Sequence, residues 1–266
     1  MIDLKYRMLL LVLMFTAMSK AQVLPDSIMK HNFRSQVKSL DEFIQRFNAV
    51  ELHPDSDSRY YNLISLFDYE VMRASVQDSL VKRKIEEFVE VVDSRNVMIK
   101  LTDGELYAEI DVEAIICEKR VMLKLYLQSQ TYREDRTRWA IVGAKGLVDS
   151  GLIETQKFYG ISPVDHEIHF LGLDNIFENN LKEIMGYRGK DTLIDELSVL
   201  LTMAMLDKVR IVSIDNLTFH CLQVPGYIFK IKESNKSSNN SGWLISKLME
   251  CDNEIKSMYV QKLLGK

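Results

Sequence analysis

The chain has 266 residues, of which 47% are hydrophobic and 27% charged, and its formal net charge is −4. This length suits one large or two ordinary domains, and the apolar content can fill a sizeable core, which excludes a disordered or fibrous protein. A mildly acidic chain without a basic stripe also argues against nucleic-acid binding and against adhesion to an anionic membrane, because both depend on clustered Lys and Arg.

The N-terminal residues have the pattern of an export signal. Lys5 and Arg7 form a basic region, Met8–Met18 is an apolar run, and Ser19-Lys20-Ala21 ends in a small residue. The run is shorter than the roughly 20 residues that a membrane span needs, although a short uncleaved anchor or a buried helix is the alternative. We therefore expect a signal peptide at residues 1–21, no stable membrane span, and a periplasmic or secreted protein. The mature chain would carry a net charge of −6, because the segment holds three basic residues and one acidic residue.

Helical patterns follow the export signal. Apolar residues at i, i+3, i+4 and i+7 predict a helix over Leu40–Phe47, and Ser39 with Glu42 forms a capping box at its start. A second helix is expected over Arg59–Arg73 and a third over Leu80–Val92, each with one apolar side.

After the third helix the apolar period changes from 3.6 to 2, which is typical of strands. Val97–Leu101 is a short β-like run, and Asp103-Gly104 is a hairpin turn signal. The run Glu105–Cys117 predicts a long strand, Arg120–Thr131 an antiparallel return, and Thr137–Leu147 a third strand.

The second half repeats this order after a linker at Gly151–Pro163, where glycine and proline interrupt the pattern. The expected elements are helices over Leu173–Met185 and Leu193–Leu206, strands over Val209–Cys221, Tyr227–Lys232 and Trp243–Met249, and a last helix over Glu254–Leu264.

The two halves match each other when the sequence is shifted by 104 residues. This shift places Trp139 on Trp243, the only two tryptophans, and also superimposes Cys117 on Cys221. Agreement of two rare residue types indicates an internal duplication. We predict an α+β fold of two similar units, residues 22–150 and 151–266, each with helices followed by a curved antiparallel meander. Both tryptophans are expected in the core.

The strand Trp139-Ala140-Ile141-Val142-Gly143, following helices and a long meander, resembles the nuclear transport factor two-like family, and Trp243-Leu244-Ile245-Ser246 repeats it less closely. The resemblance is to tandem cystatin-like cone or SnoaL-like domains, here in an exported bacterial protein. It implies a sheet that wraps around helices and leaves a pocket at its wide mouth. Some members of the family are enzymes and many only bind a ligand or a partner, so the fold does not choose between these.

Three cysteines and one histidine pair are candidates for covalent or metal chemistry. Cys221 and Cys251 lie at the same end of the second meander, but strands two apart are separated by about 9.6 Å, whereas a disulfide needs Cα atoms within about 7 Å. They form a bridge only if the loops bring them together, and otherwise the thiols are expected to be buried. His166 and His169 with Asp165 would share a face on a helix, but the pattern there is typical of a strand, so no metal site is predicted.

Three carboxylates alternate along the first strand and so share a face: Glu109, Asp111 and Glu113. Carboxylates in contrasting environments can act as general acid and base. The alternative is a solvated sheet face: with a turn at Glu118-Lys119, Glu113 would pair with Lys124 and Asp111 with Tyr126. The alternative is favoured, so no catalytic, cofactor-binding or metal-binding residue is predicted, and no cofactor.

Three functions remain compatible with the sequence. The first is an exported, non-enzymatic module that binds an unknown small molecule or protein partner. The second is a SnoaL-like hydrolase or isomerase that uses a pocket carboxylate, which a buried Asp or His converging with a Tyr would favour. The third is a structural subunit of a cell-envelope complex, which an exposed apolar patch on one sheet would favour.

Overall fold

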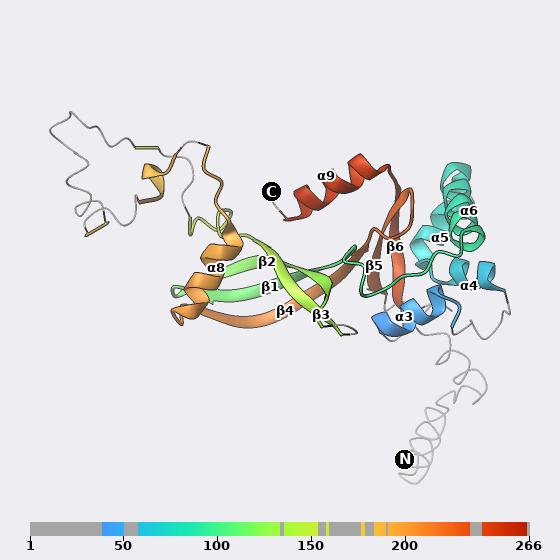
Figure 1. The fold of residues 1–266 in the computed structure, drawn as a ribbon, viewed down its shortest axis with the longest axis horizontal. Coiled ribbons are helices and arrows are strands. Elements are labelled where there is room, and N and C mark those ends of the chain that lie inside the picture. The colour runs from blue at the N-terminus through green and yellow to red at the C-terminus, as the bar shows by residue number, and fades with distance from the viewer. Residues whose placement is uncertain are drawn as a thin grey trace, which may run out of the picture.

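The computed structural model describes residues 39–50, 58–133, 136–153, 158–159, 177–178, 184–189, 191–234 and 241–264. Within these residues the fold is α+β, as the sequence predicts, with six α-helices and one six-stranded antiparallel sheet (Figure 1). The elements are α3 (Leu40–Phe47), α4 (Arg59–Ser65), α5 (Tyr69–Gln77), α6 (Ser79–Ser94), β1 (Leu106–Ile116), β2 (Lys119–Thr131), β3 (Thr137–Lys145), the short 3₁₀ helix η2 (Ile184–Tyr187), α8 (Glu196–Met205), β4 (Val209–Cys221), β5 (Tyr227–Ser234), β6 (Gly242–Glu250) and α9 (Asn253–Leu264).

The strands of both halves belong to a single sheet, in the order β3-β2-β1-β4-β5-β6. The first three strands form one meander and the last three another, and β1 joins them by pairing antiparallel with β4. The order is symmetric about this pair, and Asp111 lies opposite Asp215, its match in the 104-residue shift. This symmetry is what a duplicated meander would produce. The duplication itself and the division at residue 150 stay predictions.

The helix expected over Arg59–Arg73 is interrupted, so that prediction is wrong: α4 ends at Ser65 and α5 begins at Tyr69. Between them the backbone binds the edge strand β6, with the Asp68 N–H donating to the Ile245 carbonyl at 2.9 Å and the Ile245 N–H to the Leu66 carbonyl at 2.7 Å. Asp68 then caps α5 by accepting a hydrogen bond from the Glu70 N–H. The long-range bonds to β6 replace helical bonds that the local pattern favours.

The starts of α3 and α6 agree with the sequence, because the side chains that cap them are close in sequence to the groups they bind. The Ser39 hydroxyl accepts a hydrogen bond from the Glu42 N–H at 3.2 Å, which is the N-cap half of the expected capping box. Asp78 caps α6 in the same way, through the Leu80 N–H.

The segment Val97–Leu101 is not a strand, although its residues alternate like one. Its backbone is paired by side-chain amides instead: Asn48 donates to the Ile99 carbonyl at 2.9 Å and accepts from the Ile99 N–H at 2.8 Å. Gln223 makes the same two bonds to Lys100. These amides satisfy the backbone as a neighbouring strand would, which explains the β-like pattern without a hairpin.

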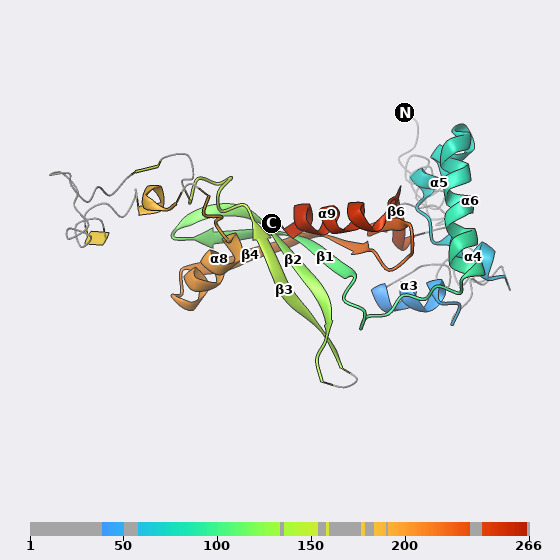
Figure 2. The ribbon, with the colours of Figure 1, turned by 45° about the horizontal axis from the view of Figure 1, so that its top comes forward.

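The helices of the first half pack against the meander of the second half. Figure 2 shows α3–α6 gathered at the end of the molecule that holds β5 and β6. At the centre of this core, the Phe229 ring of β5 lies 5.8 Å from the Phe47 ring and 5.6 Å from the Phe88 ring, and all three side chains are fully buried. These aromatic contacts attach the helices to the second meander.

The remaining helices lie elsewhere on the sheet. Helix α8 covers the other end of the same face, where Leu200 packs with Val112 and Leu123, and α9 lies on the opposite face over Tyr107 and Tyr126. The helix expected over Leu193–Leu206 is present as α8, but it is shorter, from Glu196 to Met205. None of the described helices is long and apolar enough to cross a membrane. The signal peptide expected at residues 1–21 and most of the helix expected over 173–185 lie outside the described residues.

The tryptophans do not both lie in the core, so that expectation is wrong for Trp139, whose exposed fraction is 37%. Trp139 and Trp243 instead flank one buried ring, since Phe219 of β4 lies 5.7 Å from the first and 5.1 Å from the second. Trp139 lies on β3, an outermost strand of the sheet, and is partly exposed, whereas Trp243 of β6 packs against the α3–α6 core.

The aromatic core and the sheet edge should therefore respond differently to truncation. We expect Phe229→Ala to lower the free energy of unfolding by roughly 3–5 kcal/mol, because it leaves a cavity among buried rings. Trp139→Ala should cost less than half as much, since its ring is partly exposed. Urea unfolding of both variants measures this difference, and equal losses would show that Trp139 is a core residue.

Candidate functional site

The polar side chains of the sheet gather on the face that α9 covers. Glu109 and Asp111 of β1 both contact the Lys124 ammonium of β2, whose Nζ lies 2.8 Å from Glu109 Oε1 and 2.6 Å from Asp111 Oδ1. Glu113 pairs with Arg120, with Nη1 and Oε1 3.0 Å apart. The three carboxylates that the sequence places on one face thus form cross-strand ion pairs. This agrees with the solvated sheet face that the sequence favours over a catalytic site.

The partners of these carboxylates differ from the expected ones because the hairpin turn lies one residue earlier. Cys117 and Glu118 both have positive φ values, 47° and 68°, as in a type I′ turn. Asp111 is therefore opposite Lys124 rather than Tyr126, and Glu113 is opposite Met122 rather than Lys124. The sequence contains no Asn-Gly or Asp-Gly there to mark the turn, which is why the register was wrong.

Sequence analysis did not identify the two residues that complete this cluster. His220 of β4 is fully buried, and its Nδ1 lies 2.6 Å from the Tyr259 hydroxyl of α9. Its Nε2 lies 3.2 Å from Glu109 Oε2, within ion-pair distance although not aligned as a hydrogen bond. Neither residue belongs to a recognisable motif, and only the pairing of β1 with β4 brings His220 to Glu109. We call Glu109, Asp111, Lys124, His220 and Tyr259 the polar cluster.

The environment of the polar cluster fixes its charges. The close approach of His220, aided by Lys124, lowers the pKa of Glu109 to about 2, against the opposing effect of burial. Burial lowers the pKa of His220, although Glu109 acts in the opposite direction. Burial and the Glu109 charge raise the pKa of Tyr259. At neutral pH, Glu109 is therefore ionised, His220 neutral and Tyr259 protonated, so Tyr259 donates to Nδ1 and the ring proton lies on Nε2, toward Glu109.

A neutral histidine between a tyrosine and a carboxylate can relay a proton. Here, however, His220 is fully buried and does not line the hollow beside the cluster. A hollow of about 520 Å³ reaches the cluster only at Asp111 and Lys124 and is otherwise lined by groups such as Arg120, Lys145 and Asp149. Asp111 also accepts a hydrogen bond from the Asn216 amide at 3.2 Å. Asp111 and Lys124 are thus the members of the cluster that a small polar molecule in this hollow could touch.

Among the residues that the structure describes, the other sequence candidates are the three cysteines. All three cysteines are free thiols, so Cys221 and Cys251 form no disulfide, and Cys117 is exposed rather than buried. Burial raises the pKa of Cys221 to about 12. Across the ranges that the structure describes, no group of three or more His, Cys, Asp or Glu side chains could hold a metal ion. His166 and His169 lie outside the described residues.

A second candidate site is apolar. Helix α8 buries Leu200 against the sheet, and its first turn is attached to the end of β3 by Glu196, whose Oε2 accepts from the Leu147 N–H at 2.6 Å. The rest of the helix carries no charged residue, and its only polar residues are Ser198 and Thr202, so it lacks the charged outer face of a typical surface helix. Large apolar side chains of α8 and of the adjoining half of β4 are exposed, and we call them the α8–β4 surface: Leu201, Met205, Leu206, Ile211, Val212 and Ile214.

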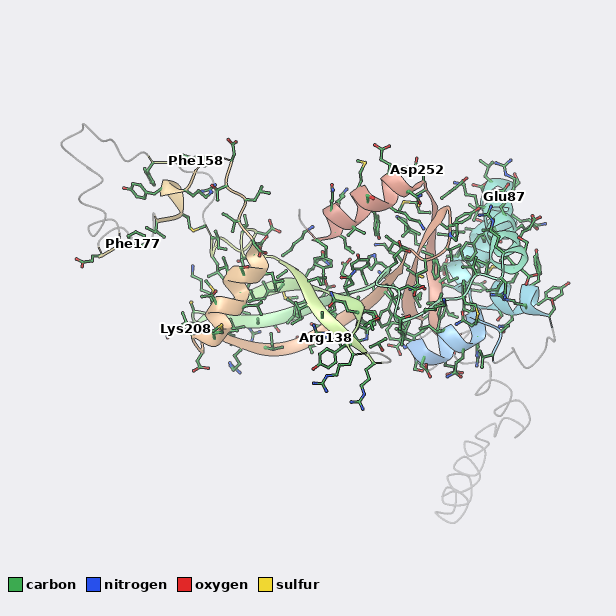
Figure 3. The ribbon with its side chains drawn as sticks, in the orientation of Figure 1. Glu87, Arg138, Phe158, Phe177, Lys208 and Asp252 are labelled. Carbon is green, nitrogen blue, oxygen red and sulfur yellow. The ribbon has the colours of Figure 1, made fainter. Side chains whose placement is uncertain are left out.

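The α8–β4 surface lies at the end of the molecule far from the α3–α6 core. Figure 3 marks this end by Lys208, between α8 and β4, and the opposite end by Glu87 of α6. The exposed fractions reach 85% for Met205, 64% for Leu206 and 69% for Ile214. Six such residues within 14 positions form a local cluster and not the scattered single exposures that are normal on a soluble protein.

Comparisons with known proteins add no relative. No protein-family model matches the chain, and it has no match among the curated proteins or the solved structures. The resemblance to the nuclear transport factor two-like family therefore stays a prediction, and function must be argued from the two candidate sites.

The buried neutral histidine should make stability depend on pH. Because the pKa of His220 is lower in the folded chain than its ordinary value of 6.5, the unfolded chain takes up the proton first. The stabilisation is present above pH 6.5 and is lost as the pH falls below it. Thermal midpoints measured between pH 7.5 and 5 should fall for the wild type and fall less for His220→Gln. Tyr259→Phe keeps the imidazole and should retain the wild-type slope, and equal slopes in all three proteins would contradict a buried neutral His220.

Proposed function

We propose that this chain is an exported, non-enzymatic interaction module that binds a protein partner through the α8–β4 surface. The observation that carries the proposal is the exposure of Met205, Leu206 and Ile214 on and beside a helix that has no charged residue after Glu196. Such a surface costs solubility, and a protein that keeps one commonly covers it with a partner. An apolar partner surface is the occupant that this composition fits, and a role as a structural subunit of an envelope complex would use the same surface.

A native gel of an extract from the compartment that holds the protein tests the proposal. Met205→Lys should leave the thermal midpoint nearly unchanged, because the side chain packs against little, and should abolish any complex larger than the chain itself on a native gel. Val76→Lys is the matched control, since Val76 of α5 is equally exposed but lies outside the surface. A wild-type chain that migrates at its own mass, or a complex that survives Met205→Lys, would sink the idea.

The second candidate function is a hydrolase or isomerase, and one observation favours it. A buried histidine does converge with a tyrosine, and the carboxylate of Asp111 at the end of the same cluster opens into a hollow of about 520 Å³. Asp111 would be the general base and Lys124 would hold an anionic group of the substrate. The ion pairs that already occupy both side chains place this function behind the first.

A ligand screen separates the two functions. Small polar metabolites are first tested for a rise in the thermal midpoint of the wild type, and any that stabilise it are then followed for chemical conversion. If the chain is an enzyme, Asp111→Asn should abolish conversion, whereas Glu113→Gln, on the same strand but paired with Arg120 instead of Lys124, should not. A ligand that binds but is never converted leaves the non-enzymatic function in place.

A further inference from the structure

Strand β4 has an open edge along most of its length. It pairs with β1 from Val209 to Cys221, but on its other side β5 pairs only with Thr218–Cys221. Among the described residues, no strand pairs with Val209–Leu217 on that side. Figure 1 shows the same arrangement: β4 borders the left part of the sheet, and β5 and β6 lie at the right. The outward backbone groups of this half-strand are available to another strand.

The composition of this edge favours pairing. Val209–Ile214 reads VRIVSI, which is rich in β-branched residues and contains no proline or glycine. Natural proteins usually protect an edge with prolines, lysines or bulges. The edge has no proline or lysine, but it has the charged Arg210 and two bulges, where β4 carries an extra residue against β1 at Val212 and at Asn216. A bulge bends the strand and discourages a flat partner, but not a partner that bends in the same way.

A second copy of the chain bends in the same way. If two β4 edges pair antiparallel about a twofold axis between Val212 and Ser213, the axis passes through the bulge, and both strands bend equally. A C2 interface needs such a self-complementary patch.

The side chains agree with this register on both faces. Ile211 would lie opposite the partner's Ile214, and both face the α8 side of the sheet, because they pair with Ala114 and Val112 of the α8 core. Arg210 would lie opposite the partner's Asp215, and both face the α9 side, since they pair with Ile115 and Asp111. The twofold axis makes each contact twice, so the register brings together two apolar pairs and two ion pairs with no like charges opposed.

We propose that the partner of the α8–β4 surface is a second copy of this chain, joined through antiparallel pairing of residues 210–215 of the two β4 strands. This inference rests on the proposed function and names its partner. The pairing extends the sheet across the dimer and places Ile211 and Ile214 of both copies in one apolar row. It also satisfies the edge backbone, which is how strand addition supplies affinity.

Sedimentation equilibrium of the purified full chain tests the proposal. The wild type should have twice the monomer mass. Arg210→Asp places an aspartate opposite the partner's Asp215, and the twofold axis makes this contact twice. The repulsion should weaken association about tenfold or more. The double variant Arg210→Asp with Asp215→Arg exchanges the charges within each pair and should restore association, although no residue of the core has changed.

Two apolar variants complete the test. Ile214→Lys should give a folded monomer, whereas Met258→Lys, at an exposed apolar position of α9, should remain dimeric. A monomeric wild type at all concentrations overturns the proposal, and so does a dimer that neither Arg210→Asp nor Ile214→Lys weakens. A purified monomer that still migrates in a Met205-dependent complex on the native gel means that a different protein is the partner, so that this inference fails and the proposed function stands. If the chain has the monomer mass both in sedimentation and on the native gel, this inference and the proposed function both fail.

Discussion

Strands β1 and β4 pair along their full lengths, from Leu106 opposite Cys221 to Ile116 opposite Val209, and this pairing joins the two halves of the chain. One face of β1 contributes Leu106 and Ala108 to the core beneath α3–α6, and Val112, Ala114 and Ile116 to the core beneath α8. Helices from both halves therefore pack on a single strand. Because a packed interior transmits strain, a change in the β1–β4 register would disturb both cores together.

The same pairing creates the polar cluster on the opposite face. It brings His220 within 3.2 Å of Glu109, and His220 in turn contacts Tyr259 of α9. Lys256 strengthens this attachment of α9, since its ammonium donates to the Val224 carbonyl at 2.7 Å. A buried polar network with these contacts fixes the position of a helix whether or not it does chemistry. The main role of the network is therefore to position α9. Its Asp111 and Lys124 side chains are the ones that line a hollow where a ligand could bind.

The α8–β4 surface and the open edge are adjacent parts of one segment, residues 201–217. Among the described residues, apolar side chains of the helix stay exposed and no strand pairs with the outer edge of Val209–Leu217. Both features are costly in water, the first through exposed apolar area and the second through the risk of uncontrolled strand pairing. A partner strand placed beside β4 would pair these backbone groups and cover Ile211 and Ile214 at the same time. The bulges at Val212 and Asn216 restrict which strand that can be, and so give the edge a specificity that a flat strand would not have.

Local physics made part of this structure predictable. The bounds of Val209–Cys221 agree between sequence and structure, because the segment is rich in β-branched and aromatic residues and contains no glycine or proline. The Ser39 cap is equally local, since donor and acceptor lie three residues apart. The carboxylates of β1 could be placed on one face because a strand has a period of two. The exact matches between the halves at a shift of 104 residues also predict two meanders of the same order, and the sheet has that order.

Only the tertiary structure decided which surfaces meet. Periodicity assigns a residue to a face but does not name the neighbouring strand, so the pairing of β1 with β4 and the contact of His220 with Glu109 could not be derived. The turn at Cys117-Glu118 was missed because its residues carry no glycine signal, and a shift of one turn residue moved every cross-strand partner. The helix expected over Arg59–Arg73 ended early because Leu66 and Asp68 found hydrogen bonds on β6, far along the chain. The β1–β4 pairing and the end of α4 depend on contacts between segments distant in sequence, whose energies override the local preference that a single sequence displays.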